Sequence, residues 1–250
     1  MQQRNQQVHS TQLNSRVLNI NSLYFAYSSQ REILSNLNLK IVPGERIGLI
    51  GPNGAGKTTL FLLICGLLSP TAGEILLFDQ PVIPGEFRPE IGLVFQNPDD
   101  QLFSPTVEDD VAFGPENMGL SPEEVQQRVQ AALSTTGIIK LAERVPHQLS
   151  GGEKCMVAIA SVLAMHPELI LYDEPSANLD LRSRRRLINF LQQSTQTILL
   201  SSHDLELILE VCDRVLLLNQ GEIIADGNPQ EVMGNRELME LNGLEKPYSL

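Results

Sequence analysis

Cysteine is scarce in this sequence, and long apolar runs are missing. The 250 residues include three cysteines, Cys65, Cys155 and Cys212, whose spacing does not match a metal site and which suit a reducing compartment. The longest apolar stretch, Leu60–Leu68, contains Gly66 and is far shorter than the ~20 residues that span a bilayer. No secretory signal opens the chain. We therefore expect a cytoplasmic protein with no membrane span of its own.

Positive charge is also scarce. The chain has 18 Lys and Arg against 30 Asp and Glu, a formal net charge of −12, which argues against a nucleic-acid-binding surface because such a surface needs clustered cations. The one basic cluster, Arg182, Arg184, Arg185 and Arg186, is interpreted as the solvated face of a helix. A hydrophobic content of 42% with 19% charged residues indicates a globular chain, and its length suits one large domain or a core with a helical insertion.

A glycine-rich loop lies between two apolar runs, Ile47–Ile50 and Leu60–Leu63. The loop consists of Gly51, Pro52, Asn53, Gly54, Ala55, Gly56, Lys57, Thr58 and Thr59, and it matches the pattern G-x-x-x-x-G-K-[ST] in full. Glycines let successive backbone N–H groups point into one concavity, which the positive end of the following helix faces. Lys57 is predicted to bridge the β- and γ-phosphates of a nucleoside triphosphate, and the Thr58 hydroxyl to bind Mg²⁺.

Apolar runs of strand length alternate with helical patterns along most of the chain. This alternation predicts an α/β fold with a mostly parallel sheet that binds its ligand at the carboxyl ends of the strands. Ser121 and Glu124 are expected to form a capping box, with Pro122 at the first helical position. Strands are expected at 17–25, 37–42, 45–50, 74–78, 91–95, 169–173, 197–201, 214–218 and 222–225, and helices from 57, at 107–119, at 122–136, after 151, at 182–193 and at 204–211.

Four further motifs follow the glycine loop: Gln96 after an apolar strand, LSGGE at 149–153, LILYDE at 169–174, and His203 after another apolar strand. In this order they resemble the ATP-binding cassette of ABC proteins, over about residues 17–230. The resemblance implies a P-loop NTPase cassette with a mostly parallel core sheet, an antiparallel β subdomain and an inserted helical subdomain. It also implies ATP hydrolysis with Mg²⁺. No internal repeat is found, so we expect a single cassette.

The carboxylates that end the LILYDE strand have the chemistry that hydrolysis needs. Asp173 can hold Mg²⁺ directly or through water. Glu174 is the next residue, so its side chain points the other way, and by resemblance it is the general base. The resemblance also makes His203 the switch histidine at the γ-phosphate and joins Gln96 to the metal and the water. Tyr27 resembles the aromatic that stacks on adenine, with Tyr24 as the weaker candidate.

Ser150, Gly151 and Gly152 open a helix, which makes them a second anion site. One chain cannot easily fold both this turn and the glycine loop onto a single nucleotide. The family's solution is a head-to-tail dimer, in which the turn closes on the partner's ATP, and Asp180 resembles part of the loop that crosses the interface. The partner is either a second copy or a paralogous ATPase. ATP supplies the differential affinity for the closed state that drives the cycle.

Residues 96–120, QNPDDQLFSPTVEDDVAFGPENMGL, resemble the ATPase subunits of energy-coupling-factor importers and of related cobalt or nickel uptake systems. In these subunits the segment receives a coupling helix from an integral membrane subunit. Asp99 and Asp100 are expected to be solvated or matched to cations of that partner. The resemblance implies an importer for a metal ion or a vitamin-like micronutrient, attached peripherally at the cytoplasmic face of the cell membrane.

Two other functions were weighed. A soluble ABC ATPase acting on ribosomes, DNA or iron–sulfur assembly is the alternative, but the sequence lacks a second cassette, a long coiled-coil insertion and a basic face. A non-hydrolysing regulatory subunit does not agree with an intact Glu174 and LSGG motif.

The domain boundaries follow from the motifs. We expect a disordered tail at 1–15, an ABC ATPase domain at 16–235 with the helical insertion at about 99–149, and a short extension at 236–250. Three departures from the family pattern stand out: Cys155 and Met156 follow Lys154 where polar or basic residues are usual, Tyr172 replaces an aliphatic residue, and the chain ends early at Leu250.

Overall fold

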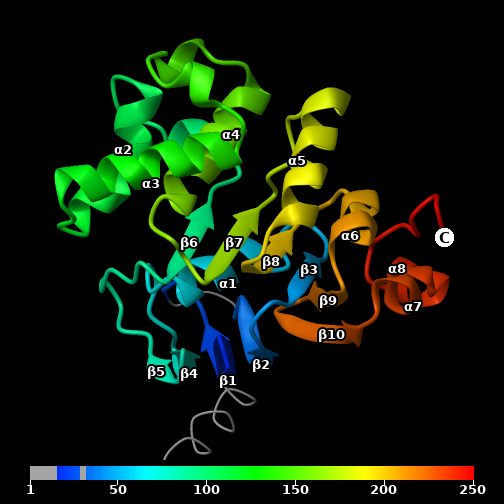
Figure 1. Cartoon of the computed structure of the whole chain (residues 1–250). Helices are drawn as coiled ribbons and strands as arrows, with labels where there is room; N and C mark the ends of the chain where they lie inside the picture. The colour runs from blue at the N-terminus through cyan, green and yellow to red at the C-terminus, as the bar shows by residue number, and fades with distance from the viewer. Residues whose placement is uncertain (1–15, 29–31) are drawn as a thin grey trace, which may run out of the picture.

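The computed structural model describes residues 16–28 and 32–250. The expected disordered tail, residues 1–15, lies outside this part of the chain. Two sheets organise the described residues, one of four strands in the order β2-β1-β4-β5 and one of six strands in the order β10-β9-β3-β8-β7-β6 (Figure 1). The two-sheet cassette architecture expected from the resemblance is confirmed.

The four-stranded sheet is antiparallel and corresponds to the expected β subdomain. Its strands are β1 (Leu18–Phe25), β2 (Leu34–Ile41), β4 (Ala72–Leu77) and β5 (Gln80–Pro81). Buried and solvent-facing residues nearly alternate along β2, as in a strand with one face on a core. β2 begins three residues before the expected strand, and β5 has no counterpart in the sequence-based prediction.

The six-stranded sheet carries the residues of the predicted site. Its strands are β3 (Arg46–Ile50), β6 (Ile91–Val94), β7 (Leu169–Asp173), β8 (Thr197–Ser201), β9 (Arg214–Asn219) and β10 (Glu222–Gly227). All neighbouring pairs are parallel except β9 with β10. The glycine loop, Gln96, Glu174 and His203 follow β3, β6, β7 and β8, so all four lie beyond the same carboxyl edge of the sheet.

The helices cover this sheet in layers (Figure 1). α1 (Lys57–Ile64) packs between the two sheets, and α2 (Val107–Asn117), α3 (Pro122–Thr135) and α4 (Gly151–Leu163) contact one another as a helical layer. The short helices η1 (Pro98–Asp100), η2 (Ile139–Leu141) and η3 (Pro146–Gln148) connect this layer. α5 (Leu181–Gln193) and α6 (Leu205–Val211) pack together, followed by α7 (Pro229–Gly234) and α8 (Arg236–Leu241), which the sequence did not predict. None of the helices in the described residues is long and apolar enough to cross a membrane.

The expected capping box at Ser121 is only half formed. The Ser121 side chain accepts from the Glu124 backbone N–H, but the Glu124 carboxylate binds Arg128 instead of returning to the cap. The complete capping box lies at Ser150, whose side chain and backbone both bond with Glu153. The LSGGE motif is therefore also the start signal of α4.

The basic cluster lies on α5, as expected, but it is not merely solvated. Arg184 pairs with Asp204, and both Arg184 and Arg185 pair with Glu210 on α6. Arg186 donates to the backbone oxygens of Thr136 and Gly137 at the carboxyl end of α3, at 2.8 and 2.9 Å. These cations therefore connect α5 to two neighbouring helices, and they do not form a free basic face.

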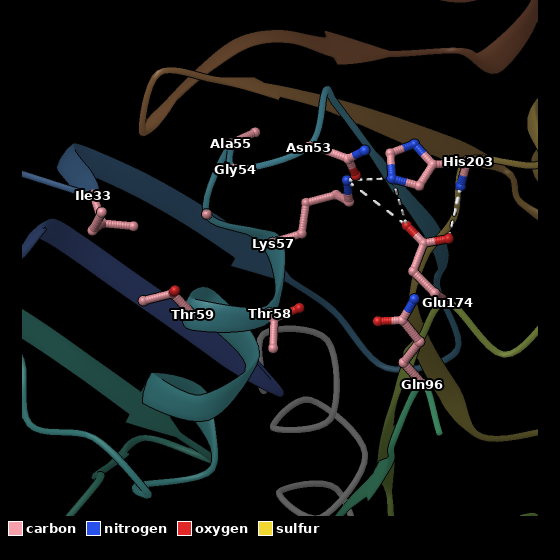
Figure 2. Close-up of a pocket in the computed structure, with 11 residues that line it drawn as sticks. Ile33, Asn53, Gly54, Ala55, Lys57, Thr58, Thr59, Gln96, Glu174 and His203 are labelled. Atoms are coloured by element: carbon pink, nitrogen blue, oxygen red, sulfur yellow. Dashed lines mark hydrogen bonds and ion pairs between the residues drawn. The ribbon is translucent and has the colours of Figure 1, made fainter. Parts of the chain in front are cut away.

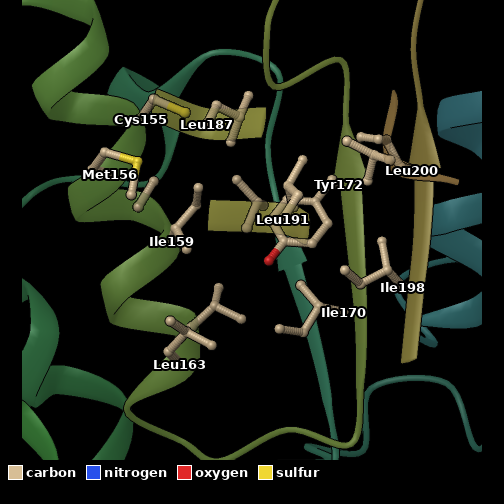
Figure 3. Close-up of a cluster of buried hydrophobic side chains, with 14 of the residues drawn as sticks. Cys155, Met156, Ile159, Leu163, Ile170, Tyr172, Leu187, Leu191, Ile198 and Leu200 are labelled. Carbon is tan, nitrogen blue, oxygen red and sulfur yellow. The ribbon is translucent and has the colours of Figure 1, made fainter. Parts of the chain in front are cut away.

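The three residues that depart from the family pattern are packed in the hydrophobic core (Figure 3). Cys155, Met156 and Tyr172 are all buried in the apolar cluster between the sheet and helices α2 to α6. Burial raises the pKa of the Cys155 thiol to about 12, so this cysteine remains a neutral thiol. The Tyr172 hydroxyl is buried without a hydrogen-bond partner among the described residues.

Candidate functional site

A cavity of about 280 Å³ opens at the carboxyl edge of the core sheet, and we call it the phosphate cavity (Figure 2). It brings together residues from the glycine loop and from the ends of β6, β7 and β8. Its lining residues are Ile33, Asn53, Gly54, Ala55, Gly56, Lys57, Thr58, Thr59, Gln96, Glu174 and His203. Four motifs that are far apart in the sequence therefore form one site.

The glycines of the loop are required by its backbone. Gly54 and Gly56 have φ angles of 79° and 107°, in the left-handed region that disfavours other residues. Gly51 meets a steric limit instead, since a Cβ there would lie 2.0 Å from the backbone oxygen of Leu218. Helix α1 begins at Lys57, directly after the loop, so its free N–H groups border the cavity. The arrangement suits an anion such as a phosphate.

Lys57, Glu174 and His203 converge at one end of the cavity (Figure 2). The Lys57 ammonium donates to the Gly51 backbone oxygen at 2.9 Å and lies 3.3 Å from His203 Nε2 and 3.7 Å from Glu174 Oε1. Burial lowers the pKa of Lys57, and the charges of Glu174 and Asp173 oppose that shift. A cation held in a poorly hydrated pocket interacts strongly with any anion that enters it.

The Glu174 carboxylate is buried, with one oxygen in a hydrogen bond and the other within ion-pair distance of Lys57 and His203. Oε2 accepts a hydrogen bond from the His203 backbone N–H at 2.9 Å, whereas Oε1 has no hydrogen-bond partner in the described part of the chain. The backbone of Glu174 has a φ of 48°, which is strained for a residue that is not glycine. The backbone N–H is fixed by Ser201, both by its backbone oxygen and by its hydroxyl. Oε1 lies 3.7 Å from the Lys57 ammonium and 3.4 Å from His203 Nε2. The rigid backbone therefore aims this oxygen into the cavity, where it can accept a proton from a water molecule.

The oxygen atoms around Thr58 suit a magnesium ion. The Thr58 hydroxyl donates to Asp173 Oδ2 at 2.7 Å, and the Ser201 hydroxyl donates to the other carboxylate oxygen at 2.7 Å. Gln96 lines the same cavity as Thr58. Hydroxyl, carboxylate and amide oxygens are the hard donors that Mg²⁺ prefers. The three residues predicted as metal ligands therefore form a compatible donor set.

Tyr27 lies beside the loop, outside the set that lines the cavity. Its hydroxyl is 3.4 Å from the Thr59 hydroxyl, its ring meets Phe25 edge to face, and 41% of the residue is exposed. An exposed aromatic face at this place is compatible with stacking on a base. Tyr24 is partly buried on β1.

Ser150, Gly151, Gly152 and Asp180 are absent from the residues described as lining the phosphate cavity. They form a separate cluster where α4 and α5 begin. Asp180 caps α5 by accepting from the Ser183 backbone N–H at 2.8 Å, a bond that lowers the pKa of its carboxyl. A Cβ on Gly152 would lie 2.2 Å from the Ser183 hydroxyl, so the close approach of the two helices requires glycine there.

Comparison with known proteins identifies the family. A family model described as ABC transporter matches residues 34–177. The chain belongs to the ABC transporter family. It is 58% identical over 233 residues to a putative ABC transporter ATP-binding protein of Synechocystis, covering 93% of this chain and 82% of that one. It is 44% identical over 239 residues to the energy-coupling factor transporter ATP-binding protein EcfA of Methanothermobacter thermautotrophicus, covering 92% of this chain and 77% of the relative.

A solved structure agrees with these relatives. CbiO1 of Clostridium perfringens, described as part of the ABC transporter complex CbiONQ, matches with a TM-score of 0.81 at 37% identity, covering 91% of this chain and 94% of that one. This ABC protein is thus an ATPase that couples ATP hydrolysis to transport.

The sequence of this ABC ATPase did not reveal every residue around the cavity. Ile33, which lines one wall, precedes β2 and carries no motif. The Ser201 hydroxyl bonds to both Asp173 and Glu174. In the sequence, only its position two residues before His203 indicates that Ser201 belongs to the site.

Proposed function

We propose that this chain is the ATPase subunit of a membrane importer that takes up a metal ion such as cobalt or nickel, or a vitamin-like micronutrient. The EcfA relative and the CbiO1 neighbour support this proposal, because one is named an energy-coupling factor transporter ATP-binding protein and the other is described as part of an ABC transporter complex. The proposal includes an integral membrane partner and a peripheral position at the cytoplasmic face of the cell membrane. It does not include a nucleic acid, since the net charge is −12.

The observation that carries the proposal is that one short segment borders two cavities. Gln96 lines the phosphate cavity, and its neighbours Phe95, Gln101 and Phe103 line a second cavity of about 470 Å³, which we call the docking groove. The full lining of the groove is Phe87, Ile91, Gly92, Leu93, Phe95, Gln101, Phe103, Asp110, Phe113, Gly114, Asn117, Ser161, Val162 and Met165. A partner seated in the groove would therefore contact residues that are close in sequence to Gln96, which lines the phosphate cavity.

The chemistry of the groove favours an apolar segment of a membrane subunit. Phe103 and Phe113 meet edge to face with ring centres 4.9 Å apart, and 67% and 49% of these residues are exposed. Asp110 is 4% exposed, and its Oδ1 accepts from the backbone N–H groups of Phe103 and Ser104, while Oδ2 has no partner among the described residues. An occupant that combines apolar side chains with one hydrogen-bond donor satisfies both features.

In the proposed reaction, the triphosphate of ATP lies on the glycine loop and Lys57 contacts the β- and γ-phosphates. Thr58, Asp173 and Gln96 would hold Mg²⁺, which would supply positive charge to offset the negative charge of the phosphoryl oxygens. Glu174 Oε1 takes a proton from the water that attacks the γ-phosphorus, the bond from this phosphorus to the β–γ bridging oxygen breaks, and ADP and inorganic phosphate leave. His203 contacts the γ-phosphate.

We further propose that the site is completed by a second copy or a paralogous ATPase in a head-to-tail dimer. The position of Ser150–Gly152 outside the phosphate cavity supports this arrangement. In it, the amino end of α4 closes on the partner's ATP and Asp180 lies at the interface. The tyrosine at position 27 stacks on adenine within its own subunit.

Affinity capture from detergent-solubilised membranes tests the importer proposal. Tagged wild-type chain is expected to recover an integral membrane subunit, and Phe103→Asp to lose it, because a charge in the groove opposes an apolar occupant. ATP binding by Phe103→Asp is expected to stay within about twofold of wild type, since the residue does not line the phosphate cavity. Leu67→Asp is the matched control, because Leu67 is similarly exposed, at 59%, and lies outside the groove.

Two outcomes would contradict the proposal. Recovery of no integral membrane protein with the wild-type chain would contradict the proposal that the chain belongs to a membrane importer. Recovery that is equal for wild type, Phe103→Asp and Leu67→Asp would place the partner elsewhere on the chain.

A further inference from the structure

Asp99 is bound by a cation of its own chain. The Lys154 ammonium lies 2.6 Å from Asp99 Oδ1 and joins η1, just after Gln96, to the second turn of α4. The backbone of Asp99 is held as well, since its N–H donates to the Asn97 side-chain oxygen at 3.2 Å. Asp99 was expected to be solvated or matched to a cation of the membrane partner; its side chain is 59% exposed, and it pairs with a cation of its own subunit.

A second residue ties the same segment to the same helix. Gln101 accepts from the Phe95 backbone N–H at 3.1 Å, and its amide nitrogen donates to the backbone oxygen of Ala158 and to the Ser161 hydroxyl, at 3.0 and 3.2 Å. The segment is thus attached to α4 at Asp99 and at Gln101, and Gln96 lies three residues before the first of these attachment points.

The first turns of α4 also reach the segment of the proposed general base. The Cys155 thiol, next to Lys154, donates to the backbone oxygen of Pro175 at 3.5 Å, and Pro175 follows Glu174. A cavity of about 190 Å³ lies where the three segments meet, lined by Gln96, Asp99, Lys154 and Pro175 among others. The start of α4 is therefore in contact with two of the segments that border the phosphate cavity, those that follow β6 and β7.

We propose that Asp99 and Lys154 are a positioning pair, which sets the amino end of α4 relative to Gln96. The inference rests on the proposed head-to-tail dimer, because there the turn Ser150–Gly152 meets the ATP of the other subunit. The pair touches no nucleotide, so it acts on turnover through the placement of that turn. Gln101 lines the docking groove and is bonded to α4 as well. A shift of the groove wall is therefore expected to shift the turn Ser150–Gly152 at the start of α4, and the reverse.

The Asp99–Lys154 ion pair is partly exposed to solvent, so its effect on turnover can be distinguished from an effect on folding stability. The Asp99 side chain is 59% exposed and that of Lys154 16%, and ion pairs at such places contribute little to folding. Loss of the pair should therefore leave the fold intact. The Michaelis constant for ATP should also hold, because the glycine loop of the same subunit is untouched.

Steady-state ATP hydrolysis by the purified full chain tests the inference. Asp99→Asn and Lys154→Met keep side-chain size but remove the charges, and each is expected to lower kcat by about 3- to 30-fold with KM within about twofold. Lys154→Arg keeps the charge and is expected to retain at least about half of the wild-type kcat. Glu240→Gln is the matched control, because it breaks a comparable ion pair on α8, between Glu240 and Arg236. The Glu240 side chain is 57% exposed, close to the 59% of Asp99. The kcat of Glu240→Gln should equal that of wild type.

Three results would overturn the inference. Wild-type kcat in both Asp99→Asn and Lys154→Met would show that the pair does not act on turnover. Equal losses in Lys154→Arg and Lys154→Met would show that charge is not the property that matters. A fall in kcat accompanied by a Tm loss of more than about 5 °C would make the pair an element of stability.

Gly151→Asp distinguishes failure of this inference from failure of the dimer. A side chain fits there, since the nearest atom to an added Cβ is the Asn178 oxygen at 3.7 Å. If Gly151→Asp abolishes turnover while the pair variants turn over normally, the dimer stands and the positioning pair is wrong. If Gly151→Asp also turns over normally, the dimer itself is wrong.

Discussion

At the scale of single residues, the site depends on one buried carboxylate that accepts a hydrogen bond through one oxygen only. Glu174 is 6% exposed, His203 binds one oxygen through its backbone, and the strained backbone at φ 48° keeps the other oxygen in the cavity. That second oxygen has no hydrogen-bond partner among the described residues, but the Lys57 ammonium at 3.7 Å offsets the cost of burying its charge. An oxygen that faces the cavity without a hydrogen bond is placed to accept a proton from water.

Glu174→Gln removes the proton acceptor and keeps the shape of the side chain. ATP hydrolysis is expected to slow by roughly 10²- to 10⁴-fold, the usual contribution of a general base. ATP binding should remain, since the glycine loop and Lys57 are unchanged. Lys57→Ala is the contrasting control and should lose ATP binding itself, as measured by equilibrium titration. Near-normal turnover of Glu174→Gln would remove Glu174 from the mechanism.

At the scale of elements, β7 is packed on all sides with α4 and α5 over one face (Figure 3). Tyr172, in the middle of this packing, has a relative exposure of 0%, and its hydroxyl has no partner in the described residues. An unpaired buried hydroxyl reduces the stability of the folded state because it has lost its hydrogen bonds to water. The Tyr172 hydroxyl is therefore a cost to stability, within the core that holds the strand carrying Asp173 and Glu174.

Tyr172→Phe is expected to raise the free energy of unfolding by about 1 kcal/mol, because it removes the unpaired group and keeps the ring. The measurement is urea unfolding at equilibrium, with a higher midpoint and an unchanged slope. Tyr248→Phe is the control and should be neutral, since Tyr248 is 97% exposed. A lower midpoint for Tyr172→Phe would show that the hydroxyl has a partner after all.

The elements also show how far the sequence could be interpreted. The strands that end in functional residues were predictable, because five-residue apolar runs such as β7 and β8 are buried throughout and end in polar motifs. α7 and α8 were not predicted, since each has only six residues, although Asn228 and Asn235 cap them. The Asp99–Lys154 contact joins residues 55 positions apart, so no local pattern indicates it.

At the scale of the whole molecule, the residues of the predicted site fall into two groups. Lys57, Glu174, His203 and their neighbours surround the phosphate cavity, while Ser150–Gly152 lie at the start of α4, outside the residues that line it. Motifs in the sequence predicted most members of both groups, but not Ile33, which lines the phosphate cavity. A second copy that brings its own α4 to the cavity would unite them, and this is the central claim of the proposed function.

The molar mass of Glu174→Gln in Mg²⁺ and ATP, measured by light scattering during gel filtration, tests that claim most directly. Slow hydrolysis should trap the closed state, so we expect double the 27.7 kDa of one chain with ATP and a single chain without it. The doubling should disappear when Gly151→Asp is added, because like charges then oppose each other at the partner's γ-phosphate. A mass of one chain in saturating ATP would contradict ATP-driven closure between two copies of this chain.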